Sequence, residues 1–271
     1  MNTNSEAIRP ADSAAHTGCI LSTQAGLLQV QVFSSRAAMG AAAGKDVVQR
    51  INRLLQQQQT VRIVFAAAPS QAELLACLVG DGSIDWSRVE AFHMDEYIGL
   101  PPGAPQRFSR FLMEHLFGKV KPGRVHLIDD SEGIEAACEA YTALIKQAPI
   151  DIVCLGIGEN GHIAFNDPPV ADFNDPHIIK PVVLDRACKQ QQVNDGCFAS
   201  IGAVPVQALT LTIPALLSGR YLYCVVPGPT KSEAVKNTLT GPVTTACPAS
   251  VLRTHPQCCL YLDSAAYSQL L

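Results

Sequence analysis

Charged side chains are scarce in this sequence. Only 16% of its 271 residues are Asp, Glu, Lys or Arg, whereas 48% are hydrophobic. Disordered chains combine high charge with little apolar surface, so this balance excludes a wholly disordered chain and indicates a sizeable buried core. The apolar runs, such as 63–68 and 221–226, are far shorter than the roughly 18 residues that a membrane span needs. The sequence therefore predicts a compact protein that does not cross a membrane.

Positive charge is also thinly spread. The 20 Lys and Arg residues are scattered singly, and the net charge is −4. No basic stripe can neutralise a run of phosphates, so we expect no nucleic-acid partner. C-x-x-C pairs are absent, and His255, Cys258 and Cys259 form an isolated cluster without a second pair of ligands. We therefore expect the ten cysteines to be reduced and no metal to be bound.

The first 26 residues have neither the apolar core of a signal peptide nor an Arg-rich amphipathic pattern. We expect residues 1–26 to be a poorly ordered or extended leader. No linker or repeat divides the rest, so residues 27–271 are expected to fold as a single domain. Without a targeting segment, the expected location is cytoplasmic.

Segments rich in β-branched and aromatic residues alternate with helical patterns along the chain. This alternation predicts an α/β fold with a mainly parallel sheet and helices on both faces. The expected strands cover residues 28–33, 61–66, 89–93, 125–128, 150–157, 221–226 and 259–262. The expected helices cover a segment from an N-cap at 34 or 35 to 55, then 70–79, 108–117, 133–146 and 231–239. The apolar strand 150–157 should lie centrally, and the Asn, Asp and Pro residues of 166–181 predict a long loop.

Open parallel sheets bind ligands at the carboxyl ends of their strands, so the segments after the strands are the first candidates. Small residues and a helix start follow the strand 61–66, in the order Ala67, Ala68, Pro69, Ser70 and Gln71. Small side chains let an anion approach the backbone, and the N–H groups of a helix start favour phosphate. The alternative is close packing of strand and helix, with Ser70 as an ordinary N-cap.

Two adjacent carboxylates, Asp95 and Glu96, directly follow the strand 89–93. One of them could face a ligand cavity at the strand end while its neighbour points away. The alternative is an N-cap or a solvated turn.

The glycine-rich segment 156–168 formally fits the pattern G-x-G-x-x-G of dinucleotide-binding sites. It lies in the middle of the chain and runs into Asn166-Asp167-Pro168, so it does not open a long helix, and we reject that interpretation. The glycines are better explained by a tight turn that brings His162 close to a small ligand. An imidazole exchanges protons near neutral pH, and Asp167 could orient its ring, whereas a purely structural His162 is the alternative.

At these residues the chain resembles the glucosamine-6-phosphate deaminase (isomerase) family, whose relatives include the 6-phosphogluconolactonases. Residues 94–101 are similar to the family's M-D-E-Y-V-G-L-P, and residues 158–168 to its G-x-D-G-H-I-A-F-N-E-P. With Lys231 and residues 248–250, the similarity covers about 28–265. The lactonases share the Gly-His pair but lack the other two segments together, so the deaminase branch fits better.

The resemblance implies a modified Rossmann-like fold and an enzyme that converts glucosamine 6-phosphate to fructose 6-phosphate plus ammonia. The reaction is an aldose–ketose isomerisation followed by hydrolysis of an imine, and the resemblance implies no cofactor. Asp95 would move a proton from C2 to C1, and His162, oriented by Asp167 and Asn160, would open the sugar ring. The implied substrate contacts are Ala67, Ala68, Ser70, Gln71, Glu96, Gly161, Lys189 and Lys231. An amino sugar phosphate and a homo-oligomer are the partners it implies.

Departures from the family pattern leave the substrate open. Asn160 and Asp167 replace an aspartate and a glutamate, residues 66–71 replace a glycine-rich phosphate turn, and Lys189 stands among glutamines where an arginine would contact phosphate. Some relatives that act on galactosamine 6-phosphate also carry Asn at the position of Asn160, so a galactosamine-6-phosphate deaminase is one alternative. The others are a 6-phosphogluconolactonase-like hydrolase, with His162 activating water, and a non-catalytic sugar-phosphate-binding module.

Overall fold

The computed structural model describes residues 16–271, and its main element is an eight-stranded sheet in the order β1-β2-β11-β10-β7-β3-β4-β6. All neighbouring strands are parallel except β1 and β2, which are antiparallel. β7 lies between β10 and β3, so the prediction of a central strand is confirmed. The strands are β1 (Cys19–Ala25), β2 (Leu28–Phe33), β3 (Val61–Phe65), β4 (Val89–His93), β6 (Arg124–His126), β7 (Ile152–Leu155), β10 (Tyr221–Val226) and β11 (Cys258–Asp263).

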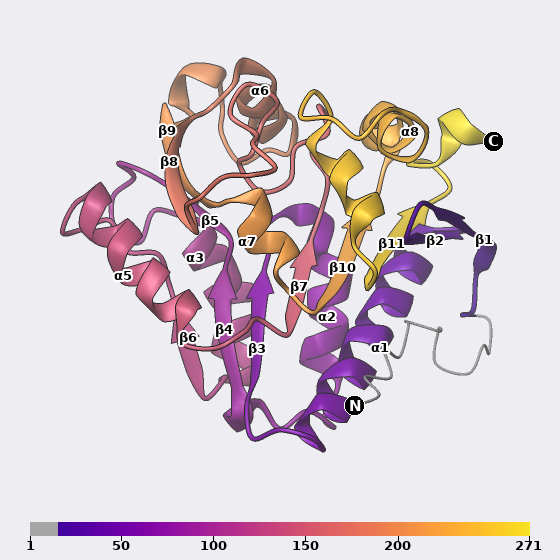
Figure 1. Cartoon of the computed structure of the whole chain (residues 1–271), viewed down its shortest axis with the longest axis horizontal. Helices are drawn as coiled ribbons and strands as arrows, with labels where there is room; N and C mark the ends of the chain where they lie inside the picture. Colours follow the sequence, from indigo (N-terminus) through magenta and orange to yellow (C-terminus); the bar gives the residue numbers. More distant parts are fainter. Residues whose placement is uncertain (1–15) are drawn as a thin grey trace.

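Helices cover both faces of this sheet, as predicted (Figure 1). Side chains alternate between the faces along each strand, so Ile63 and Phe65 of β3 contact one core cluster and Val64 contacts the other. The first cluster contains the buried residues of α1 (Arg36–Leu55) and α2 (Ala72–Gly80). The second contains those of α5 (Ile134–Lys146), α7 (Ile213–Leu217) and α8 (Ser232–Thr240).

A second, antiparallel sheet lies at the carboxyl ends of the parallel strands (Figure 1). It consists of β5 (Asp95–Tyr97), β9 (Gln207–Leu211) and β8 (Ile179–Val183), in that order, and α6 (Arg186–Asn194) follows β8. A third core cluster packs against it and includes the aromatic residues Tyr97 of β5, Phe165 and Phe198. The sequence did not predict this sheet, because its pairs join segments that are far apart in the chain.

The remaining helical segments are short. α3 (Phe108–Leu112) continues through a π-helical turn (Met113–Phe117) into α4 (Gly118–Val120). The 3₁₀ turns are Pro69–Gln71, Trp86–Arg88, Ile201–Ala203, Pro229–Lys231, Pro248–Thr254 and Ser268–Leu270. None of the helices between residues 16 and 271 is long and apolar enough to cross a bilayer.

Part of the expected leader belongs to the main sheet. Residues 19–25 form β1, which pairs with β2 through a tight turn at Gly26, where φ is +60°. β1 therefore lies before the expected boundary at residue 27, and residues 1–15 of the expected leader lie outside the described part. β1 was missed because its side chains are mostly exposed, so it lacks the apolar pattern of a buried strand.

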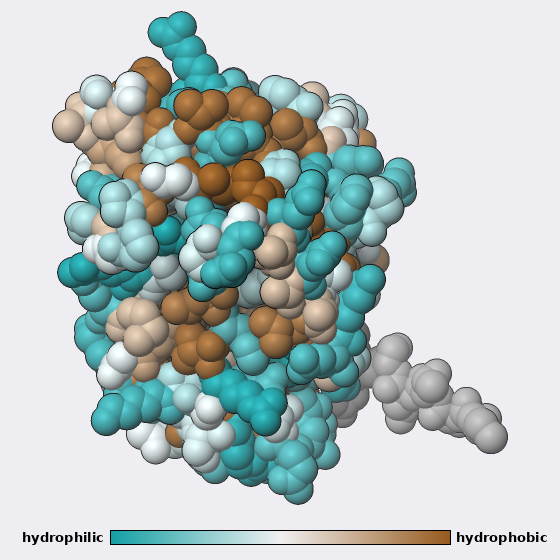
Figure 2. Space-filling model, turned by 90° about the vertical axis from the view of Figure 1, so that its left-hand side faces the viewer, coloured by the Kyte–Doolittle hydropathy of each residue, from teal (hydrophilic) through white to brown (hydrophobic). Residues whose placement is uncertain are grey.

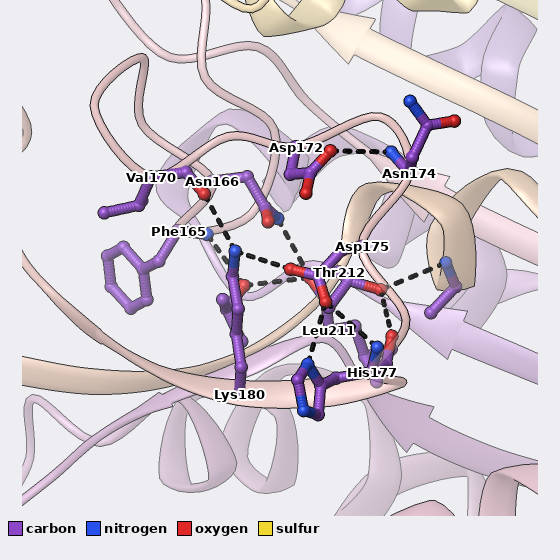
Figure 3. Close-up of polar contacts among 12 residues, drawn as sticks. Phe165, Asn166, Val170, Asp172, Asn174, Asp175, His177, Lys180, Leu211 and Thr212 are labelled. Carbon is purple, nitrogen blue, oxygen red and sulfur yellow. Dashed lines mark hydrogen bonds and ion pairs between the residues drawn. The ribbon is translucent and has the colours of Figure 1, made fainter.

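The predicted loop 166–181 is three residues shorter than expected, because β8 begins at Ile179. Lys180 of β8 attaches this loop to the small sheet. Its ammonium lies 2.7 Å from Oδ2 of Asp175 and donates to the carbonyl of Val170 at 2.8 Å. The hydroxyl of Thr212 donates to the carbonyl of His177 at 2.8 Å (Figure 3). The loop is therefore an ordered wall of the small sheet.

Candidate active site

A cavity of about 220 Å³ opens at the carboxyl ends of the parallel strands. Its walls come from the segments after β3, β4, β7 and β10, together with α6. Asp95 and His162 both line it. The parallel sheet thus brings two side chains from distant parts of the chain to one cavity, where open α/β sheets generally bind their ligands.

Asp95 is the first residue of β5 and is 6% exposed. The pairing of β5 with β9 places it opposite Thr210. Burial, and to a lesser extent the charge of Glu96, raises the pKa of Asp95 well above its ordinary value of 3.8. Because Asp95 lines the cavity, its carboxylate can act on a ligand there. A carboxylate with a raised pKa is a stronger base than an exposed one.

Glu96 points away from the cavity, which corrects the expected substrate contact. Its carboxylate accepts the backbone N–H groups of Phe108 at 3.0 Å and Ser109 at 2.9 Å, at the start of α3. Nε of Arg107 lies 3.5 Å from Oε2 of Glu96, and Nη2 of Arg107 donates to Asp130 at 2.9 Å. Because alternate side chains of a strand point to opposite faces, only one of the two adjacent carboxylates can face the cavity.

His162 lies on a tight turn after β7, and its ring is held by two side chains. Nδ1 of His162 is 2.7 Å from Oδ1 of Asn160 and 3.0 Å from Oδ1 of Asp167. The amide of Asn160 also donates to Oδ1 of Asp167 at 2.8 Å, which closes a triangle of contacts. An ionised carboxylate only accepts hydrogen bonds, so Nδ1 carries the proton and Nε2 of a neutral ring has a free lone pair.

Asp167 is 1% exposed and does not line the cavity. Burial alone would raise its pKa, but the hydrogen bond and charge of His162, with hydrogen bonds from Asn160 and Cys188, outweigh burial and lower the pKa below 3.8. Asp167 is therefore an ionised group at neutral pH. It can orient His162 and stabilise the protonated ring during a reaction.

Gly161 shapes the turn and does not line the cavity, which corrects the expected substrate contact. Its φ of +84° is a left-handed conformation that favours glycine. A Cβ at this position would lie 2.8 Å from Sγ of Cys247. The carbonyl of Gly161 accepts the N–H of Ala249 at 2.8 Å, which ties the turn to residues 248–254. Asn160, like Asp167, acts on the cavity only through His162.

The segment after β3 forms one end of the cavity. Ala67, Ala68, Ser70 and Gln71 all line it, and the chain turns there from β3 through Pro69–Gln71 into α2. Gln71 is 1% exposed, and its amide donates to the carbonyls of Leu155 at 3.4 Å and Val225 at 3.3 Å. It therefore holds the ends of β7 and β10 against this turn.

Lys231 also lines the cavity, at the end of the turn Pro229–Lys231. It is 6% exposed, and its ammonium has no hydrogen-bond partner among residues 16–271. The carboxylate of Glu159 is 4.0 Å away. Burial lowers the pKa of Lys231 below 10.5, while the charges of Asp195 and Glu159 partly offset this effect. A buried ammonium without a partner, facing a cavity, is suited to bind an anion.

Lys189 does not line the cavity, so it does not replace the missing arginine. The residues of α6 that reach the cavity are Gln191 and Gln192.

Arg36, at the start of α1, is a cation of the cavity wall that sequence reasoning missed. It too follows the carboxyl end of a parallel strand, β2, so the rule that located the other segments could have found it.

One group of three side chains in the described part of the chain could hold a metal ion. His162, Asp167 and Cys188 are buried, and their ligand atoms lie within 4.8 Å of one another. The existing contact between Nδ1 of His162 and Asp167 already occupies two of these ligands. The same atoms therefore fit a hydrogen-bonded pair that orients the imidazole.

Residues 34–260 match a protein family described as glucosamine-6-phosphate isomerases/6-phosphogluconolactonase. A glucosamine-6-phosphate deaminase of Halothermothrix orenii is 37% identical over 200 residues, which cover 72% of this chain and 81% of that protein. A glucosamine-6-phosphate deaminase of Arthrobacter sp. (strain FB24) is 33% identical over 250 residues, which cover 90% of this chain and 93% of that protein.

Solved structures show the same fold. A monomeric glucosamine-6-phosphate deaminase superimposes with a TM-score of 0.80 at 26% identity, covering 88% of this chain and 98% of its own. A 6-phosphogluconolactonase from Thermotoga maritima superimposes with a TM-score of 0.72 at 21% identity, covering 87% of this chain and 99% of its own. At that identity the lactonase shows the fold alone. The homo-oligomer that the resemblance implied stays a prediction.

Proposed function

Because this chain belongs to the family of glucosamine-6-phosphate isomerases and 6-phosphogluconolactonases, we propose that it converts glucosamine 6-phosphate to fructose 6-phosphate and ammonia. The observation that carries this proposal is the pairing of two proton-transfer groups in one cavity. Asp95 is a buried carboxylate with a raised pKa, and His162 has a free Nε2. The names of the deaminase relatives, 33% and 37% identical to this chain, support the same reaction.

Ring opening comes first and uses His162. Nε2 takes the proton of the C1 hydroxyl, the bond between C1 and the ring oxygen breaks, and the ring oxygen receives the proton. The imidazole carries a positive charge between these two transfers. Asp167, ionised and 3.0 Å from Nδ1, stabilises that charge. Asn160 replaces a carboxylate in this arrangement and supplies a dipole without charge.

Isomerisation follows and uses Asp95. Its carboxylate removes the proton from C2 of the open aldehyde, which gives an enolamine, and returns a proton to C1. One base can serve both carbons because they are adjacent, so no relocation of the substrate is needed. The product is an imine at C2, and water adds to it and releases ammonia. Atoms balance with one water consumed for each ammonia formed.

The phosphate end of the substrate lies between residues 66–71 and Lys231. The small side chains of Ala67 and Ala68 let a phosphate oxygen approach the backbone, and Ser70 offers a hydroxyl. Binding energy from this remote group orients the reacting carbons over Asp95.

The proposed location in the cell is cytoplasmic.

Ammonia release from a panel of 2-amino-hexose 6-phosphates tests the proposal. We expect glucosamine 6-phosphate to be the best substrate. A faster reaction of galactosamine 6-phosphate would instead assign that epimer as the substrate. The Asp95→Asn variant should lose about 10²–10⁴-fold in turnover while still binding substrate. Asp172→Asn makes the same chemical change in an exposed loop and should leave turnover unchanged.

Two outcomes would reject the proposal. A fully active Asp95→Asn variant that also opens 6-phosphogluconolactone would assign the chain to the lactonases, because His162 alone can activate water. Tight binding of sugar phosphates without turnover of any of them would assign it as a binding module.

A further inference from the structure

Among residues 16–271, Lys231 is the buried lysine or arginine that lines the cavity, and a phosphate needs a second cation. A phosphate monoester carries about −1.5 to −2 charges at neutral pH, so the single ammonium of Lys231 leaves charge unbalanced. The glutamines of α6 are neutral, so they cannot balance this charge, and their side-chain oxygens are held by other groups. Oε1 of Gln191 accepts the N–H of Glu159 at 2.8 Å, and Oε1 of Gln192 accepts the hydroxyl of Tyr97 at 2.7 Å.

Arg36 is placed beside the turn 66–71 by the close packing of α1 on α2. Arg36, Gly40 and Gly44 lie four residues apart, so they share one face of α1. A Cβ at Gly40 would lie 2.2 Å from Cβ of Glu73, and one at Gly44 would lie 2.4 Å from Cβ of Cys77. The two glycines thus let the helices touch, and the same face carries Arg36, one turn earlier, over the start of α2.

The guanidinium of Arg36 is oriented by two contacts and keeps free donors. Nε donates to Oε1 of Glu73 at 2.6 Å, and Nη2 donates to the carbonyl of Pro69. Pro69 belongs to the turn 66–71 that lines the cavity. A guanidinium has five N–H donors, so three remain for a ligand, two of them on Nη1. This planar group is therefore held beside the turn with its open edge available.

We propose that Arg36 is the second phosphate-binding cation of this chain, together with Lys231, which lines the same cavity. The proposal rests on the proposed function, because the phosphate is that of the amino sugar substrate. The family resemblance implied that Lys189 of α6 contacts the phosphate. The proposal assigns this role to Arg36 of α1 instead. A phosphate monoester fits this pair because its several oxygens can accept charged hydrogen bonds from both an arginine fork and an ammonium.

Calorimetric binding of inorganic phosphate and steady-state kinetics with glucosamine 6-phosphate test this role. The Arg36→Gln variant should weaken phosphate binding and raise KM roughly tenfold or more, since a charged hydrogen bond is lost. Turnover at saturating substrate should fall much less than kcat/KM. Arg36→Lys should recover part of the binding because it restores the charge without the fork.

Two control variants separate phosphate binding from a structural effect. Arg53→Gln removes the same charge from an exposed position at the other end of α1 and should leave KM unchanged. Glu73→Gln removes the charge of the ion pair but keeps an oxygen that can accept from Nε of Arg36, so it should weaken phosphate binding much less than Arg36→Gln does. If Glu73→Gln weakens binding as much as Arg36→Gln does, or if Arg36→Gln binds phosphate normally, the inference is wrong. Phosphate binding is measured without turnover, so a failure here is distinct from an absence of ammonia release.

Discussion

The ring of His162 occupies the space that a side chain at residue 158 would need. A Cβ at Gly158 would lie 2.1 Å from Cε1 and 2.3 Å from Nε2 of His162. The backbone reinforces this contact, since the N–H of Gly158 donates to the carbonyl of His162 at 2.9 Å. Gly158 therefore leaves room for the imidazole, and Asn160 and Asp167 hold the ring in that space.

The Gly158→Ala variant should lose activity while remaining folded. The added methyl cannot coexist with the present ring position, so the imidazole must leave its contacts with Asn160 and Asp167. We expect kcat for cyclic glucosamine 6-phosphate to fall about 10- to 100-fold, because displacement of a proton-transfer group by about 1 Å has effects of this size.

An open-chain analogue of the substrate provides the check, because it does not need ring opening. The loss in Gly158→Ala should be much smaller on the analogue, and the same difference should appear in His162→Gln. Equal losses on both substrates would contradict the role of His162. Gly202→Ala is the matched control, since a Cβ at Gly202 meets no atom within 4 Å.

The raised pKa of Asp95 predicts a loss of activity in mildly acidic solution. The carboxylate is the active base, and protonation removes it, so kcat/KM should fall as pH drops through a pKa well above 3.8. The substrate phosphate titrates near pH 6 and could give a similar limb. A ¹³C NMR titration of labelled aspartate in the free protein distinguishes the two, with Asp95→Asn used to assign the signal. A value near or below 3.8 would contradict the burial argument.

Strand ends could be predicted from the sequence because a parallel sheet collects them on one edge. The rule found Asp95, His162 and the segment 66–71, all of which line one cavity, while Lys231, which lines it too, was expected only from the family resemblance. It works because apolar strands are visible in the sequence and their direction follows from the βαβ alternation. It also applies to Arg36, which follows β2, although no distinctive motif marks that residue.

Side-chain direction could not be predicted in the same way. Asp95 faces the cavity and Glu96 does not, because β5 pairs with β9, a strand more than a hundred residues later. No local pattern encodes that pairing. The position of Lys189 depends similarly on how α6 packs beside the small sheet. The family resemblance assigned substrate contacts by sequence position. It was wrong for Glu96, Gly161 and Lys189, because residues near them in the sequence line the cavity in their place.

Glu96 should prove important for folding rather than for substrate affinity. It holds the start of α3 through two N–H groups and contacts Arg107, with 1% of its side chain exposed. Glu96→Ala should cost about 2–4 kcal/mol of unfolding free energy, because the N–H groups of Phe108 and Ser109 lose their acceptor, while Arg107 keeps Asp130 as a partner. The KM of the folded fraction should change little. Glu114→Gln, which removes an exposed charge paired with Arg110, should change stability by less than about 1 kcal/mol.

The loop after Asn166 should be stabilised by Asp175 in a pH-dependent way. Burial alone would raise the pKa of Asp175, but hydrogen bonds from Lys180 and His177 and the charge of Lys180 outweigh it and lower the pKa below 3.8. A lowered pKa means that the folded state favours the ionised form. The stabilisation is therefore present above pH 3.8 and is lost as pH falls through the lower folded-state pKa.

Urea unfolding of Asp175→Asn at several pH values measures this effect. At pH 7 the variant should lose about 1–3 kcal/mol, since Lys180 keeps its charge but loses its partner at 2.7 Å. The difference from wild type should shrink as pH falls below the ordinary pKa of an aspartate, because the wild-type carboxylate then becomes protonated. Asp172→Asn, in the same loop but bonded only to the N–H of Asn174, should stay within about 0.5 kcal/mol (Figure 3). Hydrophilic and hydrophobic residues are interspersed on the face of the molecule in Figure 2. A pH-independent loss in Asp175→Asn would point to altered packing instead of the ion pair.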